Sequence, residues 1–199
     1  MKSVETIIAE ALTAGRNTLS EYDSKRILAE YEIPTTREFL AEDLAGVEQA
    51  ADRIGYPVAL KACAAAAQHK TEMSLIELGI RDAVELKQAY DRLAPKARDL
   101  GGAILVQEMV AGSRELVMGL IRDPQFGPCV MFGLGGIFTE ALGDVSFRVA
   151  PLSDRDARAM PAEIRGAKIL EGFRGMAPAQ TEQLSHCLRW WGLSTGPEG

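Results

Sequence analysis

The sequence is poor in the residues that cross-link proteins, bind metals or anchor them in membranes. Its 199 residues include three cysteines and two histidines. Cys63, Cys129 and Cys187 are widely spaced and form no C-x-x-C pair, so we expect reduced, partly buried thiols rather than disulfides or a zinc site. No apolar run approaches the ~18 residues of a membrane span. No basic run offers a phosphate-neutralising face, so we expect neither a membrane nor a nucleic-acid partner.

The N-terminus also lacks the apolar core of a signal peptide, because charged residues interrupt positions 1–15. We therefore expect a cytoplasmic protein. The net charge is −6, and hydrophobic residues make up 47% of the chain. Such a composition is typical of a packed globular protein with one ordinary domain or two small lobes.

Helical and extended patterns alternate along the first hundred residues. "SVETIIAEALTAG" and "EYDSKRILAEY" place apolar residues at helical spacing, and Ser20 can cap the second of these helices. "TTREFLA", "YPVALKAC" and "SLIELGI" are typical of strands. "EDLAGVEQAADRIG" and "DAVELKQAYDRLAPKARDL" are typical of helices, with a stop at Gly55 and a cap at Asp82.

From Gly101 to Leu152 the patterns are mostly extended. "AILVQEMV" and "RELVMGLIRD" predict two strands joined by a hairpin at "AGS", and "CVMFGLGG", "IFTEAL" and "SFRVAPL" extend the sheet. Two helices follow from Ser153 onward. The order predicts an α+β fold of two lobes with a cleft between them, which is the usual place for a ligand.

Lys61 ends the apolar strand "PVALK". A lysine at the end of a buried strand must bring its ammonium to water or to an anion, so it is either a strand-end lysine reaching solvent or a phosphate contact. Glu108 and Glu115 leave a similar choice open. They are ordinary surface acids, or carboxylates beside strand-end amides that bind the hydroxyls of a ribose.

His69 lies in a polar loop, "QHKTE", where an imidazole can act as a base, a metal ligand or a phosphoryl acceptor. A solvated loop histidine is the alternative. His186 falls in a helical pattern and is assigned to packing or solvent.

The stretch "GLGG" contains Gly133, Gly135 and Gly136 but is neither a dinucleotide-binding G-x-G-x-x-G nor a P-loop. Its amides could face an anion, and a β-turn explains the glycines equally well. Glu140, Asp144 and Arg148 follow at intervals of four, which places them on one face of a strand, or merely near one another across a turn.

Taken together, these segments are more specific than any of them alone. "LSEYDSKRILAEYEIP", "IGYPVALKA", "HKTE", "ILVQEMVAGSRELVMGLIRDPQFGPCVMFGLGGIFTEALGDVSFRVAPL" and "ILEGFRG" occur in an order and spacing that closely resemble the ATP-grasp domain of ADP-forming acyl-CoA synthetases. The resemblance runs from about Thr18 to Gly175 and continues more weakly to about Leu188. An unrelated α+β ligase is a poorer fit, because "RDPQFGPCVMFGLGGIF" is long and particular.

The resemblance implies an ATP-grasp fold with an N-terminal helix (1–17), a first lobe (18–105), a second lobe (106–199) and a nucleotide cleft between the lobes. It also implies an acid–thiol ligase that interconverts acyl-CoA, ADP and phosphate with acid, CoA and ATP through phosphohistidine. ATP or ADP and Mg²⁺ are the implied cofactors. The implied partner is a CoA-binding alpha subunit or domain.

The resemblance also implies roles for individual residues. His69 resembles the histidine that exchanges phosphate with the nucleotide. The implied ATP-binding residues are Lys61 at the phosphates, Glu108, Met109 and Val110 at the adenine, and Glu115 at the ribose. The residues implied to lie beside the phosphates are Gly135, Gly136, Glu140 and Arg148.

Two departures from the family pattern bear on function. Met73, Ser74 and Leu75 stand where the family has a valine and paired glycines, so we expect a stiffer loop after His69. The sequence also lacks the acid-x-Asn-Pro-Leu motif that supplies magnesium ligands, so we expect a C-terminally shortened domain and assign no metal ligands. The alternative is a degenerate ATP-grasp domain that acts as a nucleotide-binding regulatory module or as a scaffold, without catalysis.

Overall fold

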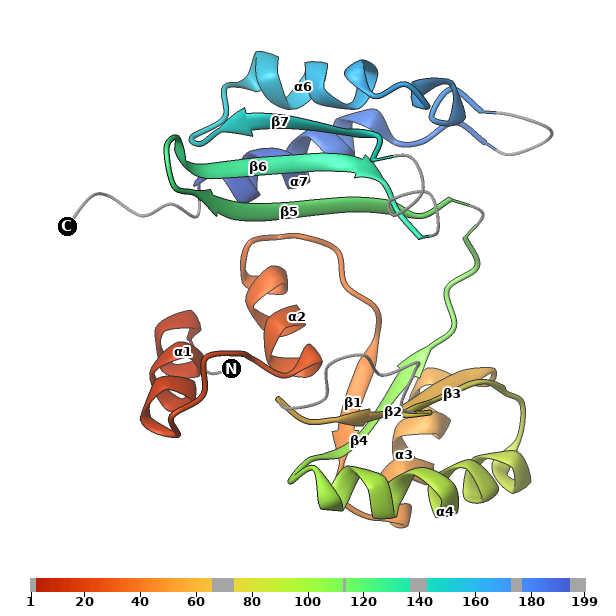
Figure 1. The fold of residues 1–199 in the computed structure, drawn as a ribbon. Coiled ribbons are helices and arrows are strands. Elements are labelled where there is room, and N and C mark those ends of the chain that lie inside the picture. The colour runs from red at the N-terminus through yellow and green to blue at the C-terminus, as the bar shows by residue number, and fades with distance from the viewer. Residues whose placement is uncertain (1–2, 66–73, 113, 137–142, 173–176, 194–199) are drawn as a thin grey trace. The chain divides into compact units, whose positions relative to one another are not determined.

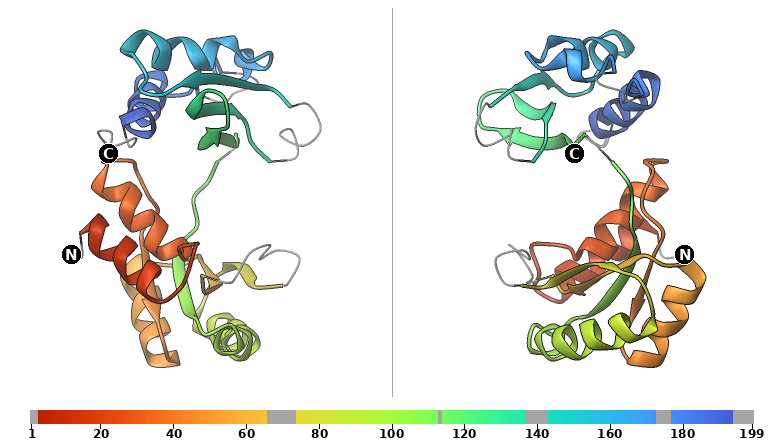
Figure 2. Two further views of the ribbon diagram at one scale, coloured as in Figure 1. Left: turned by 60° about the vertical axis from the view of Figure 1, so that its left-hand side comes forward. Right: turned by 90° about the vertical axis from the view of Figure 1, so that its right-hand side faces the viewer.

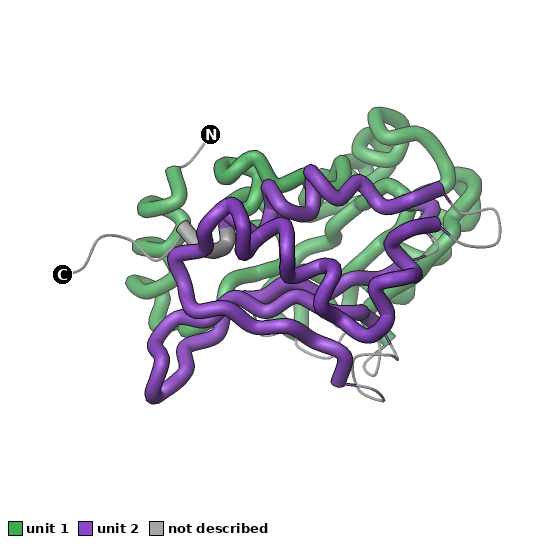
Figure 3. Tube along the Cα trace, turned by 90° about the horizontal axis from the view of Figure 1, so that it is seen from above, with its two compact units in different colours: residues 1–110 green, residues 111–199 purple. Residues whose placement is uncertain are grey.

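The computed structural model describes residues 3–65, 74–112, 114–136, 143–172 and 177–193. The chain divides into two compact units, residues 1–110 and residues 111–199, which Figure 3 colours separately. None of the helices in the described part has the length and apolar character needed to cross a lipid bilayer.

Unit 1 contains four helices and four strands in its described part. In chain order they are α1 (Val4–Thr13), α2 (Glu21–Glu30), β1 (Glu38–Ala41), α3 (Leu44–Ile54), β2 (Val58–Cys63), β3 (Ile76–Ile80), α4 (Ala83–Asp99) and β4 (Ala103–Glu108). The strands form one antiparallel sheet in the order β1-β4-β2-β3. Helices α3 and α4 pack on one face of this sheet (Figure 1).

The core of unit 1 lies between the sheet and those two helices. It contains Val58 and Leu60 from β2 and Val106 from β4, all completely buried, packed against Val47 of α3 and Leu86 of α4. Because successive side chains of a strand point to opposite faces, residues between these core positions face away from α3 and α4. That opposite face carries the polar residues discussed below.

Unit 2 is a three-stranded antiparallel sheet with helices on one face. Its elements are β5 (Leu116–Asp123), β6 (Gly127–Leu134), β7 (Val145–Val149), α6 (Asp154–Glu163), a 3₁₀ turn (Ala167–Ile169) and α7 (Thr181–Leu193). The strand order is β5-β6-β7. Helix α6 packs on β7 and on α7, and α7 packs on β5 and β6 (Figure 2).

The hairpin predicted at "AGS" is wrong. Strand β4 pairs with β1 on one side and β2 on the other, while β5 pairs with β6 in the sheet of the second unit. Both hydrogen-bonding edges of β4 are therefore occupied within unit 1. The apolar patterns identified both strands correctly, but they carry no information about which strand is the partner.

Several local predictions are confirmed. The Ser20 hydroxyl caps α2 by accepting a hydrogen bond from the Asp23 backbone N–H at 3.1 Å. The Asp82 carboxylate caps α4 by accepting from the N–H groups of Val84 and Glu85. All three cysteines are unpaired and buried. The predicted strand "IFTEAL" lies outside the described residues.

Phe132 belongs to the core of unit 2, and its replacement tests the packing of that core. Its ring is completely buried between β6 and the helices. Replacement with alanine removes this contact area and leaves a cavity, so Phe132→Ala is expected to lower the free energy of unfolding by about 3–5 kcal/mol. Chemical denaturation measures the change.

The matched control for Phe132→Ala is Phe147→Ala. Phe147 lies on β7, next to the residue paired with Phe132, and its side chain is 45% exposed. We expect this variant to lower the free energy of unfolding by less than about 1 kcal/mol, because the Phe147 side chain is already half exposed to water. Equal losses from the two variants would contradict the description of this core.

Candidate functional site

The face of the unit 1 sheet opposite α3 and α4 is polar near its centre. Lys61 of β2 follows Leu60, whose side chain is in the core, so Lys61 points to the other face. Gln107 of β4 and Glu38 of β1 lie opposite each other in the register. Helix α2 supplies charged side chains to the same face.

These side chains form one connected group of charges and hydrogen bonds. The Lys61 ammonium contacts the Glu21 carboxylate at 2.7 Å, and the same carboxylate oxygen lies 2.9 Å from the Lys25 ammonium. Lys25 also donates to Glu38 at 2.6 Å and to Gln107 at 2.8 Å. We call Glu21, Lys25, Glu38, Lys61 and Gln107 the lysine cluster.

The lysine cluster is largely shielded from water. Side chains of Lys61 and Glu21 are 16% and 22% exposed, and that of Glu38 is 7% exposed. Two ammonium groups and two carboxylates balance, so the cluster is neutral overall. Such close pairing offsets the cost of removing these charges from water.

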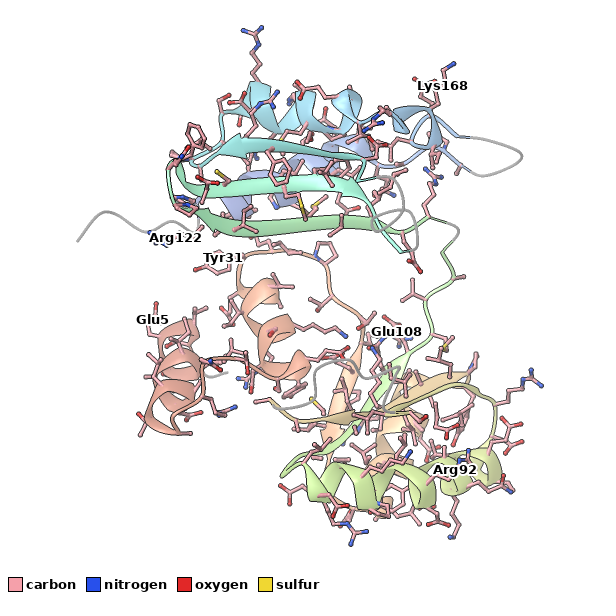
Figure 4. All side chains as sticks on the ribbon, viewed as in Figure 1. Glu5, Tyr31, Arg92, Glu108, Arg122 and Lys168 are labelled. Carbon is pink, nitrogen blue, oxygen red and sulfur yellow. The ribbon has the colours of Figure 1, made fainter. Side chains whose placement is uncertain are left out.

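The predicted adenine-contacting segment begins at the end of β4, where Figure 4 labels Glu108. Glu108 accepts hydrogen bonds from the Arg37 backbone N–H at 2.8 Å and from its guanidinium at 2.7 Å. The backbone bond first, and the guanidinium second, lower the pKa of Glu108, so its carboxylate is held ionised. Met109 and Val110 follow with exposed side chains, Val110 being 64% exposed.

In unit 2 the structure brings Glu115, Gly135 and Gly136 together. The Gly135 N–H donates to the Glu115 carbonyl at 2.7 Å. A Cβ atom on Gly135 would lie 2.9 Å from the Glu115 carbonyl carbon, and Gly136 adopts a φ of +61°, which favours glycine. These two glycines follow β6, and they allow the backbone there to lie close to Glu115, the residue just before β5.

Gly135→Ala is expected to destabilise the protein by about 1–3 kcal/mol, because its Cβ would force the Glu115 backbone to move. The control is Gly112→Ala, since nothing lies within 4 Å of a Cβ built on Gly112. Thermal unfolding of the two variants measures the difference. The description of the turn is wrong if Gly135→Ala is as stable as Gly112→Ala.

Asp144 and Arg148 have partners within unit 2. The buried Asp144 carboxylate accepts hydrogen bonds from the Arg165 and Gly166 N–H groups, both at 2.7 Å. Arg148 of β7 pairs with two acids of α6, at 2.5 Å to Glu163 and 3.5 Å to Asp156. Both side chains thus tie the sheet to the segment that follows it.

His69 and Glu140 lie outside the described residues. Ser74, the first residue described after the His69 segment, has a φ of +52°. This is the left-handed region that glycine adopts readily and serine rarely. The Lys96 ammonium donates to the Ser74 carbonyl at 3.0 Å and holds this turn against α4.

Glu21, Lys25 and Arg37 were not among the site residues predicted from the sequence. The four-residue spacing of Glu21 and Lys25 on a helix was a visible signal of their mutual ion pair. Nothing in the local sequence indicated the contact from Glu21 to Lys61, forty positions away. Within the described ranges, no group of three or more His, Cys, Asp or Glu side chains could hold a metal ion.

Comparison with known proteins identifies close relatives. The profile of the ATP-grasp domain matches residues 10–191. The chain is 40% identical to the beta subunit of ADP-forming acetate–CoA ligase II of Pyrococcus furiosus, over 89% of this chain and 78% of that subunit. The beta subunit of isoenzyme I from the same organism is also 40% identical, with 89% and 79% covered.

Solved structures of similar proteins also match this chain over most of its length. A Ca. Korarchaeum cryptofilum protein in complex with coenzyme A matches with a TM-score of 0.89 and 40% identity, over 96% of this chain and 85% of that one. The dinucleotide-forming acetyl-coenzyme A synthetase 1 of that organism, in complex with coenzyme A and Mg-AMPPCP, matches with a TM-score of 0.85 and 38% identity, with 98% and 87% covered. The predicted fold class is confirmed.

Proposed function

The chain belongs to the ATP-grasp domain family, and on this premise we propose that it is the nucleotide-handling part of an ADP-forming acyl-CoA synthetase. The reaction interconverts acyl-CoA, ADP and phosphate with acid, CoA and ATP. The observation that carries the proposal is the 40% identity to acetate–CoA ligase beta subunits across 89% of the chain. A CoA-binding alpha subunit or domain is the proposed partner.

Lys61 and His69 are the residues that we propose to act in phosphoryl transfer. We assign the Lys61 ammonium to the nucleotide phosphates, where a positive charge offsets the charge of the transferring group. A ring nitrogen of His69 attacks the γ-phosphorus, a new N–P bond forms, the bond to the ADP oxygen breaks and ADP leaves. In the direction of ATP synthesis the same bonds form and break in reverse.

The remaining residues are assigned to nucleotide binding. We propose that the segment Glu108–Val110 contacts the adenine through its backbone and that Glu115 contacts the ribose. The proposed residues beside the phosphates are Gly135, Gly136, Glu140 and Arg148. The pairing of Glu108 with Arg37 supports a backbone role for this residue, because its carboxylate is already engaged.

Magnesium is proposed to enter with the nucleotide, bound to its phosphate oxygens. The described residues provide no carboxylate cluster suited to the octahedral oxygen coordination of this ion.

Titration calorimetry of Mg-ATP and Mg-ADP into the full chain tests the proposal. Saturable binding of both nucleotides at one site per chain is the expected result. If a folded chain binds neither, the nucleotide-handling role is wrong. The alternative, a scaffold with an ATP-grasp fold and no nucleotide, would then take its place.

A further inference from the structure

Lys61, which the proposed function assigns to the nucleotide phosphates, has a carboxylate partner. Among the described residues, Glu21 is the one partner of the Lys61 ammonium, at 2.7 Å. Both side chains are more than three-quarters shielded from water, so the contact is stronger than a surface ion pair. A phosphate group that approaches this ammonium also approaches the Glu21 carboxylate, and the two negative charges repel each other.

The charges of the lysine cluster lead to the same conclusion. Glu21 and Glu38 already balance Lys25 and Lys61, so the cluster presents no net positive charge to an incoming anion. We infer that Glu21 is a built-in competitor of the nucleotide, which holds Lys61 when the site is empty and releases it to phosphate. This inference rests on the proposed function and adds to it a residue that sets nucleotide affinity.

Glu21 can release Lys61 without being left unpaired. The Glu21 oxygen that contacts Lys61 also contacts Lys25 at 2.9 Å, one helical turn along α2. Lys25 is fixed in turn by Glu38, Gln107 and Thr36. The Lys61 ammonium is the mobile member, because it sits on a flexible four-carbon stem and has no second partner among the described residues.

The substitution Glu21→Gln tests this role. It removes the negative charge but keeps the shape and an oxygen that can accept from both lysines. We expect Mg-ATP and Mg-ADP to bind about tenfold more tightly to this variant, because one repelling charge near the phosphates is gone. Glu21→Ala, which removes the acceptor as well, is expected to shift the affinity in the same direction.

The matched control is Glu77→Gln. Glu77 belongs to the same sheet but pairs with Arg92 of α4, on the face away from the lysine cluster (Figure 4 labels Arg92). This variant loses the same charge and is expected to bind nucleotide as the wild-type chain does. Thermal unfolding of every variant establishes that it is folded.

Each outcome of the titrations is decisive. Tighter binding by both Glu21 variants, with Glu77→Gln unchanged, supports the competitor role. Unchanged or weaker binding by Glu21→Gln overturns it, as does an equal gain from Glu77→Gln. If neither the wild-type chain nor any variant binds nucleotide, the proposed function itself is refuted. If the wild-type chain binds nucleotide and the Glu21 variants bind it equally well, only the competitor role of Glu21 is refuted.

Discussion

Replacing Lys61 with methionine is expected to weaken Mg-ATP binding about a hundredfold. Methionine has a similar length and apolar volume but carries no charge, so the variant loses the charge-assisted contact to phosphate and leaves the strand packing largely intact. Glu21 keeps its partner Lys25 in the variant. Equilibrium dialysis with labelled nucleotide measures the loss.

Lys87→Met is the matched control for Lys61→Met. Lys87 lies exposed on α4 and pairs with Asp91 at 2.7 Å. This variant removes the same charge from the same unit, and we expect an unchanged affinity. Should Lys61→Met still bind Mg-ATP as wild-type does, Lys61 does not contact the phosphates and its assignment fails.

Replacing His69 with alanine is expected to abolish transfer of phosphate to the chain. The proposed acceptor is an imidazole nitrogen, and alanine offers no nucleophile in its place. Wild-type protein incubated with Mg-ATP labelled in the γ-position should acquire label that is stable in base and lost in acid, as phosphohistidine is. The variant should bind Mg-ATP normally and acquire no such label.

The second histidine provides the control. His186 lies on α7, where its Nε2 accepts a hydrogen bond from the Trp190 indole at 3.0 Å. His186→Ala removes a packing contact of unit 2 and is expected to leave labelling intact. Labelling of the His69→Ala variant at the wild-type level would show that His69 is not the acceptor.

The sequence was sufficient to predict those features of the fold that depend on contacts between neighbouring residues. Ser20 and Asp82 are helix caps because their side chains bond to N–H groups two or three residues away, and both caps form as predicted. Lys61 was recognised as unusual because a charge falls in a run of apolar residues, but the expectation that it ends the strand was wrong, since β2 continues to Cys63. Its candidate role came from the resemblance to a family, and its position on the polar face follows from strand alternation.

The sequence was insufficient where contacts depend on the tertiary fold. The connection "AGS" has the length of a hairpin, yet β4 already has neighbours on both edges and β5 pairs in another sheet. The partners of Lys61 and Glu108 are Glu21 and Arg37, which are 40 and 71 positions distant. No periodicity indicates such pairs, because they follow from the placement of α2 and from the pairing of β1 with β4 rather than from spacing.

Ser74 stands in the segment where the sequence departs from the family pattern. The sequence comparison predicted that loss of glycines here would restrict the backbone. The structure places Ser74 at a φ of +52°, a conformation that serine adopts at a cost and glycine adopts freely. The stiffer loop stays a prediction.

The most direct test of the central claim is ATP formation by the full chain together with a CoA-binding alpha subunit from the same source. The assay supplies acetyl-CoA, ADP, phosphate and Mg²⁺ and follows ATP and free CoA. We predict that neither component alone forms ATP and that the mixture forms ATP and CoA in equal amounts. A mixture that assembles, binds ADP and forms no ATP from acetyl-CoA or other acyl-CoA substrates would contradict the account.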